Sequence, residues 1–243
     1  MLFRSNADLW PDVPEQGSVG ASGDLAPLAH LALSLIGEGE LNGPNGRGPA
    51  AAILRAAGLG PVTLQSKEGI ALINGTQAHT GISALAVRDA QVIWDTAQVA
   101  GAATLDALLG TPVAFDERIH AARGQDGQRV AAARLRALTD GSGIRESHRT
   151  GDPRVQDAYA LRCMPQVHGP ALEGVRFAER LLGAEINAAT DNPMVFGDGT
   201  MLSGGNFHGQ VGAMAADVLA IALTNLAVMS RSEEHTSELQ SRQ

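Results

Sequence analysis

The first residues that could do chemistry form a run of small side chains near the start of the chain. Residues 17–24 read GSVGASGD and lead into a helical apolar pattern that begins at Leu25. A glycine-rich loop before a helix can bind phosphate, but these glycines lie three apart and no Gly-Lys-Ser/Thr ending follows. Ser22 also does not fit the G-x-S-x-G pattern of a hydrolase nucleophile. Taken alone, the run predicts a tight turn.

Four further runs carry polar side chains of chemical interest. Residues 67–77 read KEGIALINGTQ, where the pair Asn74 and Gly75 by itself favours a turn. Residues 156–166 read QDAYALRCMPQ and contain Arg162, whose planar guanidinium suits a carboxylate because it donates two parallel hydrogen bonds. Without context, Arg162 is a solvated or ion-paired residue. The last two runs are NAATDNP at 187–193 and SGGNFHG at 203–209.

Taken together and in this order, the five runs resemble the signatures of the histidine and aromatic amino-acid ammonia-lyases. Three of them have the spelling of the histidine branch, namely GSVGASGDLAPLAH, RCMPQ and TDNP. Plant-type phenylalanine enzymes have TITASGDLVPLS, RTSPQ and NDNP at the matching places. The resemblance covers much of residues 6–229.

The resemblance implies that the chain makes its own electrophile. In this family an internal Ala-Ser-Gly, here Ala21-Ser22-Gly23, cyclises and loses two waters to form a methylidene-imidazolone without an external cofactor. The nitrogen of Gly23 attacks the carbonyl of Ala21, and a glycine permits the backbone geometry that this requires. Dehydration of Ser22 supplies the methylidene carbon. A helix that begins near Asp24 would favour developing negative charge at the electrophile.

The resemblance also assigns roles to residues of the other runs. Arg162 is expected to bind the substrate carboxylate, and Phe207 is expected to pack beside the ring and shield it from water. The residues expected to orient the ring and the substrate are Asn74, Gln156 and Tyr159. We expect Asn187 and Asp191 to organise the surrounding loops, and His30 and His208 to be structural.

The implied reaction is the deamination of L-histidine to urocanate and ammonia, the first step of histidine catabolism. Two alternatives stay open: a phenylalanine or tyrosine ammonia-lyase or aminomutase, and an inactive truncated helical scaffold. Family members are homotetramers about twice as long as this chain. Their tyrosine base lies upstream of the position of Gly17, and the acidic residue that contacts imidazole lies downstream of Met229. We therefore expect the 243 residues alone to be inactive.

Composition excludes several other classes. A net charge of −8 with 3% aromatic residues argues against binding to nucleic acid. Cys163 is the only cysteine, so no intramolecular disulfide can form, and a cytoplasmic protein without a targeting signal is expected. The most apolar segment, 211–229, is interrupted by Asp217, which argues against a membrane span. Asp116, His120 and His148 lack a metal-ligand spacing, so no metal site is expected.

The elements that must position these residues are mainly α-helical. Apolar residues recur at helical spacing and predict a long-helix bundle of the ammonia-lyase type, with helices over 25–36, 76–109, 171–182 and 207–229. Glycine and proline predict a small irregular or hairpin excursion near 41–66 and a surface loop over 141–153. We expect one catalytic region over 6–229. The two ends, 1–5 and 230–243, resemble translated sequencing-adapter sequence and are left out of this prediction.

Overall fold

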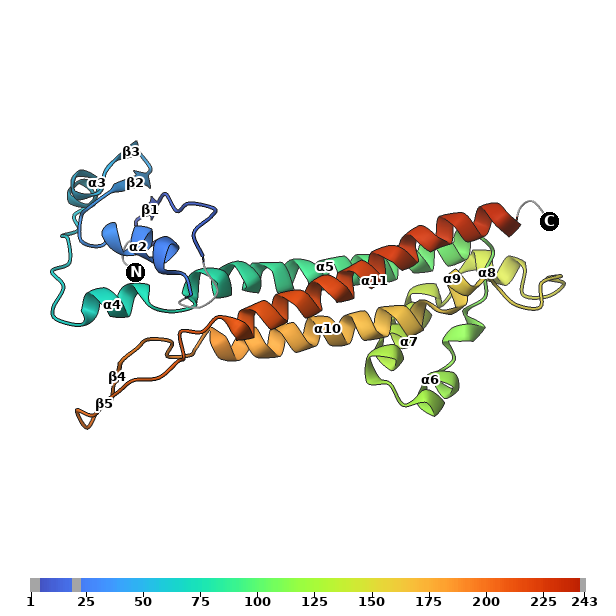
Figure 1. Cartoon of the computed structure of the whole chain (residues 1–243). Helices are drawn as coiled ribbons and strands as arrows, with labels where there is room; N and C mark the ends of the chain where they lie inside the picture. The colour runs from blue at the N-terminus through green and yellow to red at the C-terminus, as the bar shows by residue number, and fades with distance from the viewer. Residues whose placement is uncertain (1–4, 19–22, 241–243) are drawn as a thin grey trace. The chain divides into compact units, whose positions relative to one another are not determined.

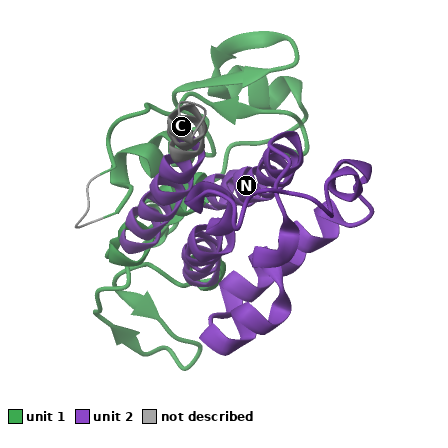
Figure 2. Cartoon of the chain, turned by 90° about the vertical axis from the view of Figure 1, so that its right-hand side faces the viewer, with its two compact units in different colours: residues 1–83, 182–213 green, residues 84–181, 214–243 purple. Residues whose placement is uncertain are grey.

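The computed structural model is mainly α-helical, as predicted, and describes residues 5–18 and 23–240, with side chains to residue 231. The chain divides into two compact units (Figure 2). Unit 1 comprises Met1–Ser83 and Leu182–Ala213, and unit 2 comprises Ala84–Leu181 and Met214–Gln243. Three long helices contribute residues to both units: α5 (Gln77–Ala107), α10 (Met164–Glu185) and α11 (Gln210–Gln240).

Unit 1 contains a small antiparallel sheet with short helices around it (Figure 1). The strands have the order β1 (Trp10–Pro11), β2 (Glu40–Gly43) and β3 (Gly46–Pro49). The hairpin β2–β3 confirms the excursion predicted near 41–66. The remaining elements are α2 (Leu25–Leu33), α3 (Ala50–Ala56), α4 (Glu68–Ile73), β4 (Met194–Val195) and β5 (Met201–Leu202). Its apolar cluster consists of Leu9, Leu41, Ala50 and Leu54.

Unit 2 has short helices between its long ones. They are η1 (Pro112–Phe115), α6 (Glu117–Arg123), α7 (Asp126–Thr139), α8 (Gly143–Ser147) and α9 (Tyr159–Arg162). Side-chain caps start three of them: Thr111 accepts from the backbone N–H of Val113, Asp116 from that of Arg118, and Ser142 from that of Arg145. The Ser142 cap helps to explain why helix α8 forms within 141–153, where the sequence predicted only a loop.

The long helices confirm the main sequence prediction, with corrected ends. Helix α5 lies within two residues of the predicted limits at 76 and 109. Helix α10 begins at Met164 rather than 171 and contains Pro170, while α11 continues past 229 to Gln240. Helix α2 ends at Leu33 instead of residue 36, ahead of a turn in which Gly37 takes a φ of 84°. Apolar periodicity therefore located the helices but not the turns that end them.

The core of unit 2 depends on small residues at helix contacts. A Cβ on Gly101 would lie 2.4 Å from the sulfur of Met164, and one on Gly174 would lie 2.7 Å from the Cβ of Ala222. The apolar side chains around these contacts form two clusters. One consists of Ala102, Leu105, Phe115, Ala132, Leu135, Leu161 and Met164, and the other of Trp94, Ala131, Ala171, Ala222 and Leu226. Close backbone approach thus compensates for the low aromatic content.

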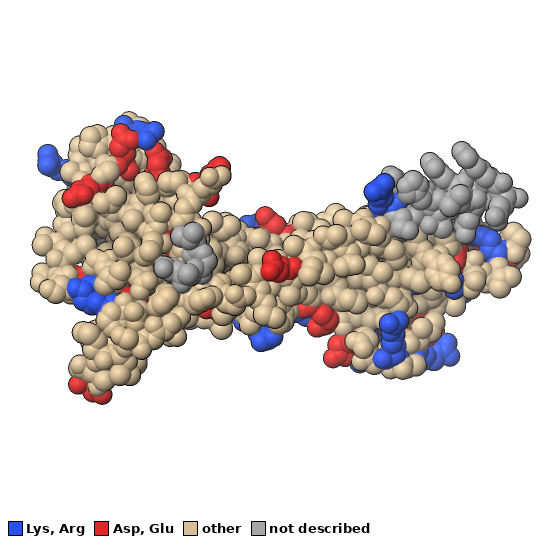
Figure 3. All heavy atoms as spheres, viewed as in Figure 1, with Lys and Arg blue, Asp and Glu red and all other residues tan. Residues whose placement is uncertain are grey.

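One helix corrects the sequence argument about membranes. Gln210–Arg231 has a mean hydropathy of 1.8 and is long and apolar enough to cross a membrane, despite Asp217. Only 28% of this segment is buried, and a core helix of a globular protein meets the same criterion. The length and composition of this helix are therefore weak evidence for or against a membrane span. On the face in Figure 3, basic and acidic side chains are interspersed, and the described residues visible there form no continuous basic stripe.

His168 is a buried polar group inside unit 2. Its Nδ1 lies 2.7 Å from Nε2 of Gln98, and its carbonyl accepts a 2.8 Å hydrogen bond from the indole N–H of Trp94. Burial lowers the pKa of His168 from 6.5 to about 4, because the imidazolium would lose its hydration. The imidazole is therefore neutral in the folded state at pH 7.

We expect Leu135→Ala to destabilise the fold by about 2–5 kcal/mol, because Leu135 is fully buried and the substitution leaves a cavity. Leu138→Ala on the same helix is the matched control, since Leu138 is 38% exposed, and it should cost less than about 1 kcal/mol. Urea unfolding measures both. Equal losses at the two positions would contradict the packing described for α7.

We expect stability to fall as the pH drops from about 6.5 toward 4. In this range the unfolded chain protonates His168 while the folded chain does not, so protons favour unfolding, by up to about 3 kcal/mol for this group. Urea unfolding of the parent protein and of His168→Gln at pH 7 and pH 4.5 measures the difference. A variant with the same acid sensitivity as the parent would show that His168 does not cause it.

Candidate active site

Three of the positions predicted from the sequence, Gly23, Asn74 and Phe207, come together in unit 1. Gly23 has a φ of +67° and pairs with Gly75, the neighbour of Asn74, in an isolated parallel bridge. A Cβ on Gly23 would lie 2.1 Å from the carbonyl oxygen of Gly75 and 3.2 Å from that of Phe207. Only glycine fits this place. Ala21 and Ser22 lie outside the described residues.

Asp24 anchors the backbone directly after Gly23. Its backbone N–H donates to the carbonyl of Gly75 at 3.0 Å, and its side chain is fully buried. The carboxylate accepts from the hydroxyl of Ser18, and from the backbone N–H of His79 at 2.7 Å. Nδ1 of His79 lies 3.1 Å from the same carboxylate. These contacts offset the cost of burying the charge.

The ring of His79 is fixed by the helix that packs beside it. A Cβ on Gly212 would lie 2.5 Å from this ring, so the backbone of α11 approaches it at a glycine. Nε2 of His79 is buried and has no partner among the described residues. Nδ1 therefore carries the proton that binds Asp24, an assignment based on the hydrogen-bond network. Sequence reasoning missed His79, because a histidine on a helix gives no signal of its distant partner.

Asn74 ends α4 and lies against residues of the 187–193 run. Its side-chain N–H group faces Oδ1 of Asp191 at 3.4 Å and the carbonyl of Asn192 at 3.3 Å. Asp191 also forms an ion pair with Lys67. Burial raises the pKa of Asp191, but the Lys67 ammonium and the N–H of Asn192 outweigh it and lower the pKa below its usual value. Asp191 thus joins the 187–193 run to the 67–77 run through Lys67 and Asn74.

Lys67 was not predicted as a site residue. It is the only lysine of the sequence, and its backbone has a φ of 78°, which is rare outside glycine. The composition could have drawn attention to Lys67, because the chain has only one lysine beside 17 arginines.

Four other polar residues of this region bind the backbone or one another. His208 accepts the backbone N–H of Gln210 at the start of α11, and the side-chain N–H group of Asn187 donates to the carbonyl of Gly183. Two hydrogen bonds link the start of α5 to the end of α10 and the segment after it: Thr76, directly before α5, donates to Glu185, the last residue of α10, and Gln77 donates to Thr190. His30 is exposed. The one charged group in these four contacts, the Glu185 carboxylate, accepts the hydrogen bond from Thr76.

The remaining three predicted residues cluster in unit 2 around helix α9. Arg162 donates to Oε1 of Gln156 at 2.7 Å, and its guanidinium lies 4.8 Å from the centre of the Tyr159 ring. Tyr159 is 74% exposed, whereas Nε of Arg162 is buried without a partner among the described residues. Oε1 of Gln166 is in the same situation. The cluster therefore offers a planar cation with unused donors, which suits a carboxylate.

The loop before α9 is held by ion pairs. Asp157 is buried, accepts the backbone N–H of Thr111 at 2.6 Å and lies 3.6 Å from Arg154. Arg154 also donates to the carbonyls of Leu108 and Leu109 at the end of α5. Hydrogen bonds from Arg154 lower the pKa of Asp152 to about 2. The loop that presents Gln156 is thus tied to a long helix.

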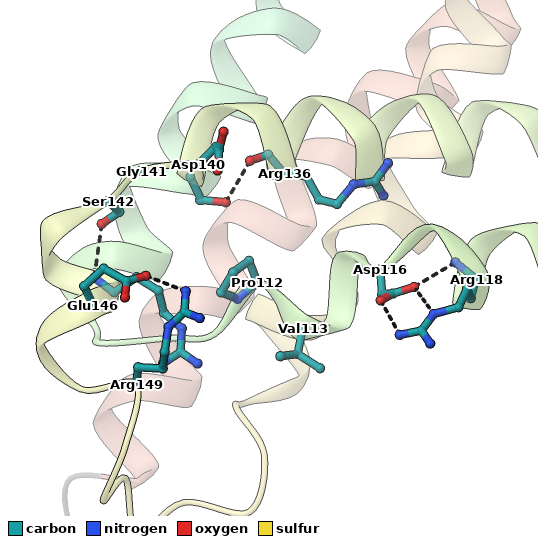
Figure 4. A pocket seen from close by; sticks show the side chains of 12 residues that line it. Pro112, Val113, Asp116, Arg118, Arg136, Asp140, Gly141, Ser142, Glu146 and Arg149 are labelled. Atoms are coloured by element: carbon teal, nitrogen blue, oxygen red, sulfur yellow. Dashed lines mark hydrogen bonds and ion pairs between the residues drawn. The ribbon is translucent and has the colours of Figure 1, made fainter.

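A hollow of about 470 Å³ lies elsewhere in unit 2, between η1, α7 and α8 (Figure 4). Its arginines include Arg118, which pairs with Asp116, and Arg149, which pairs with Glu146. None of the predicted site residues lines it. Among the described residues, no group of three or more His, Cys, Asp or Glu side chains is arranged to hold a metal ion.

The chain belongs to the aromatic amino acid lyase family, whose model matches residues 1–242. It is 56% identical over 229 residues to a histidine ammonia-lyase of Anaeromyxobacter sp. (strain K), covering 90% of this chain and 45% of that protein. The chain thus spans about half the length of the curated relatives it matches.

Solved structures agree with this placement. The structure matches histidine ammonia-lyase from Trypanosoma cruzi with a TM-score of 0.84 and 43% identity, covering 96% of this chain and 43% of that one. It also matches tyrosine aminomutase from Streptomyces globisporus with a TM-score of 0.86 and 36% identity, covering 95% and 47%. The predicted family and the helical fold are therefore confirmed.

We expect His79→Ala to destabilise the fold by about 1.5–3 kcal/mol, because the buried carboxylate of Asp24 loses a donor. His30→Ala removes an exposed histidine from α2 and should change stability by less than about 0.5 kcal/mol. Urea unfolding at pH 7 compares them. If both variants unfold like the parent, the His79 contact contributes nothing to stability.

Proposed function

We propose that this chain is part of a histidine ammonia-lyase that converts L-histidine to urocanate and ammonia. The observation that carries the proposal is the clustering of Gly23, Asn74 and Phe207 in a chain 56% identical to a histidine ammonia-lyase. The single cysteine fits a cytoplasmic enzyme.

The residues present fit a methylidene-imidazolone formed from Ala21-Ser22-Gly23. The place of Gly23 admits no Cβ, and Asp24 fixes the backbone on its C-terminal side through buried hydrogen bonds. When formed, the group supplies an electrophilic carbon for the substrate. No metal or external cofactor is part of the proposal.

The chain's own residues would bind and orient the amino acid. Arg162 has free donors for the carboxylate, and the ring of Tyr159 and the amide of Gln156 limit the positions of its guanidinium. Asn74 would orient groups near Gly23, and Phe207 would exclude water there. We place the base that removes the β-proton in the part of the relatives that this chain does not span.

We also propose that the full-length protein is a homotetramer. Large apolar side chains are exposed along α5 and α11, among them Ile82, Leu85, Val92, Ile221 and Val228. Faces of this kind become stable when a further part of the protein or a second copy buries them. The substrate is the other partner, and no nucleic acid or membrane is proposed.

The test uses the full-length protein and its Ser22→Ala variant. We expect the tryptic peptide that ends at Arg47 to be lighter than its sequence by two waters in the parent and unchanged in the variant. Ammonia release should be fast with L-histidine, slow with L-phenylalanine and L-tyrosine, and lost in the variant. If the parent is active but its peptide is unmodified, the proposal that Ala21-Ser22-Gly23 forms the electrophile is wrong.

The substrate comparison separates the alternatives. Turnover of L-tyrosine or L-phenylalanine in place of L-histidine would support an aromatic lyase or aminomutase, the activity named for the structural relative from Streptomyces globisporus. A modified peptide without turnover of any of the three would overturn the substrate assignment. An unmodified, inactive full-length protein would support the scaffold interpretation.

A further inference from the structure

Two buried polar atoms of opposite polarity lie close to the junction of α9 and α10. One is the donor Nε–H of Arg162, and the other is the acceptor Oε1 of Gln166. Neither atom has a hydrogen-bond partner among the described residues. A buried donor or acceptor without a partner costs free energy, so each of these two atoms requires an explanation.

The backbone places the two side chains on the same side of the chain. The N–H of Cys163 donates to the carbonyl of Tyr159 at 2.8 Å, and that of Val167 donates to the carbonyl of Cys163 at 3.3 Å. The chain therefore keeps the four-residue spacing of an α-helix on both sides of Cys163. Residues four apart on a helix are surface neighbours, with Cβ atoms about 5–6 Å apart. Arg162 and Gln166 are such a pair.

The core fixes the neighbouring face of this segment. Leu161, Met164 and His168 follow one another at steps of three and four residues, and all three are buried in unit 2. At 3.6 residues per turn, this buried stripe leaves Arg162 and Gln166 together on one flank. Packing of the stripe therefore holds the backbone of both residues in place.

The contacts of the Arg162 guanidinium leave room for one more partner. Its Nη1 donates to Oε1 of Gln156 at 2.7 Å, and its central carbon lies 4.8 Å from the centre of the Tyr159 ring. A guanidinium has five N–H donors in fixed directions. If Nε binds Gln166 as well, one N–H on Nη1 and two on Nη2 remain. Nη1 and Nη2 then form the fork that binds both oxygens of a carboxylate.

We propose that Gln166 is a positioning residue whose Oε1 accepts the Nε–H of Arg162 when the guanidinium binds the substrate carboxylate. The inference rests on the proposed function and adds a residue to it. The hydrogen bond gives both buried atoms a partner, and Gln156 and Gln166 together hold the guanidinium. Oε1 of Gln166 does not bind the carboxylate itself, because both are acceptors.

The test measures the binding of two probes to the full-length protein by calorimetry. 3-(Imidazol-4-yl)propionate has the carboxylate without the amino group, and L-histidinol has the amino group without the carboxylate. Gln166→Met keeps the length of the side chain and removes its acceptor. We expect the affinity for the propionate to fall about tenfold, the value of one hydrogen bond to a charged group. The affinity for L-histidinol should change less than about twofold. Equal losses for both probes, or no loss for the propionate, would overturn the inference.

A double-mutant cycle tests the link to Arg162. In the Arg162→Met background, Gln166→Met should lower the affinity for the propionate less than about twofold, because the guanidinium that Gln166 holds is gone. A further tenfold loss would show that Gln166 acts independently of Arg162 and would overturn the inference.

A structure of the parent protein with the propionate bound gives an answer that does not depend on the folding of a variant. Nε of Arg162 should lie within about 3.2 Å of Oε1 of Gln166. A distance beyond hydrogen-bond range would contradict the proposed contact.

Gln125→Met is the matched control. Gln125 is an exposed glutamine of the same unit, and its side chain makes no capping hydrogen bond at the start of α7. This variant should alter neither affinity. A selective loss of propionate binding here too would show that the effect is not specific to Gln166 and would overturn the inference.

The proposed function fails in a different way. If the parent protein binds neither probe and its peptide lacks the two-water loss, the lyase assignment is wrong. If the parent has the modified peptide and binds both probes, only the role of Gln166 is at stake. The two-water loss should persist in Gln166→Met, because ring closure uses only atoms of Ala21, Ser22 and Gly23.

Discussion

The contact between the backbones of Gly23 and Gly75 is the constraint on which the candidate site depends. Only the absence of a side chain lets the two segments meet, since a Cβ on Gly23 would lie 2.1 Å from the Gly75 carbonyl. The bridge brings the start of α2 beside the end of α4, and with it Asn74 beside the segment that is expected to cyclise. Two runs that are 50 residues apart thus become one local structure.

Ion pairs and hydrogen bonds of two buried or partly buried carboxylates then hold the segments that the Gly23–Gly75 bridge brings together. Asp24 is fully buried and Asp191 partly so, and each is held by donors from distant segments, His79 for one and Lys67 for the other. An unpaired carboxylate at either place would cost several kcal/mol, so the partners also specify the arrangement. In unit 2, Arg154 holds the loop that contains Gln156 in a similar way, by pairing with Asp157 and donating to the carbonyl of Leu108. Ionic contacts therefore hold the loops that contain Asp191 and Gln156.

The sequence predicted the long helices because apolar residues recur over many turns, as in α5. It did not predict α3, α4, α6 or α7, because the stability of such helices comes from tertiary packing more than from their local sequence. The motif residues were found through their resemblance to a family. Ser18, Lys67 and His79 were missed, because each acts on a side chain that only the fold brings near, and local pattern contains no information about such pairs.

The measurement that tests the central claim most directly is an experimental structure of the full-length protein with 3-(imidazol-4-yl)propionate bound. The account predicts a five-membered ring formed from Ala21-Ser22-Gly23, with the ligand carboxylate against the guanidinium of Arg162. It also predicts Gly23 in contact with Gly75. An intact Ser22 with the ligand bound away from Arg162 would contradict it.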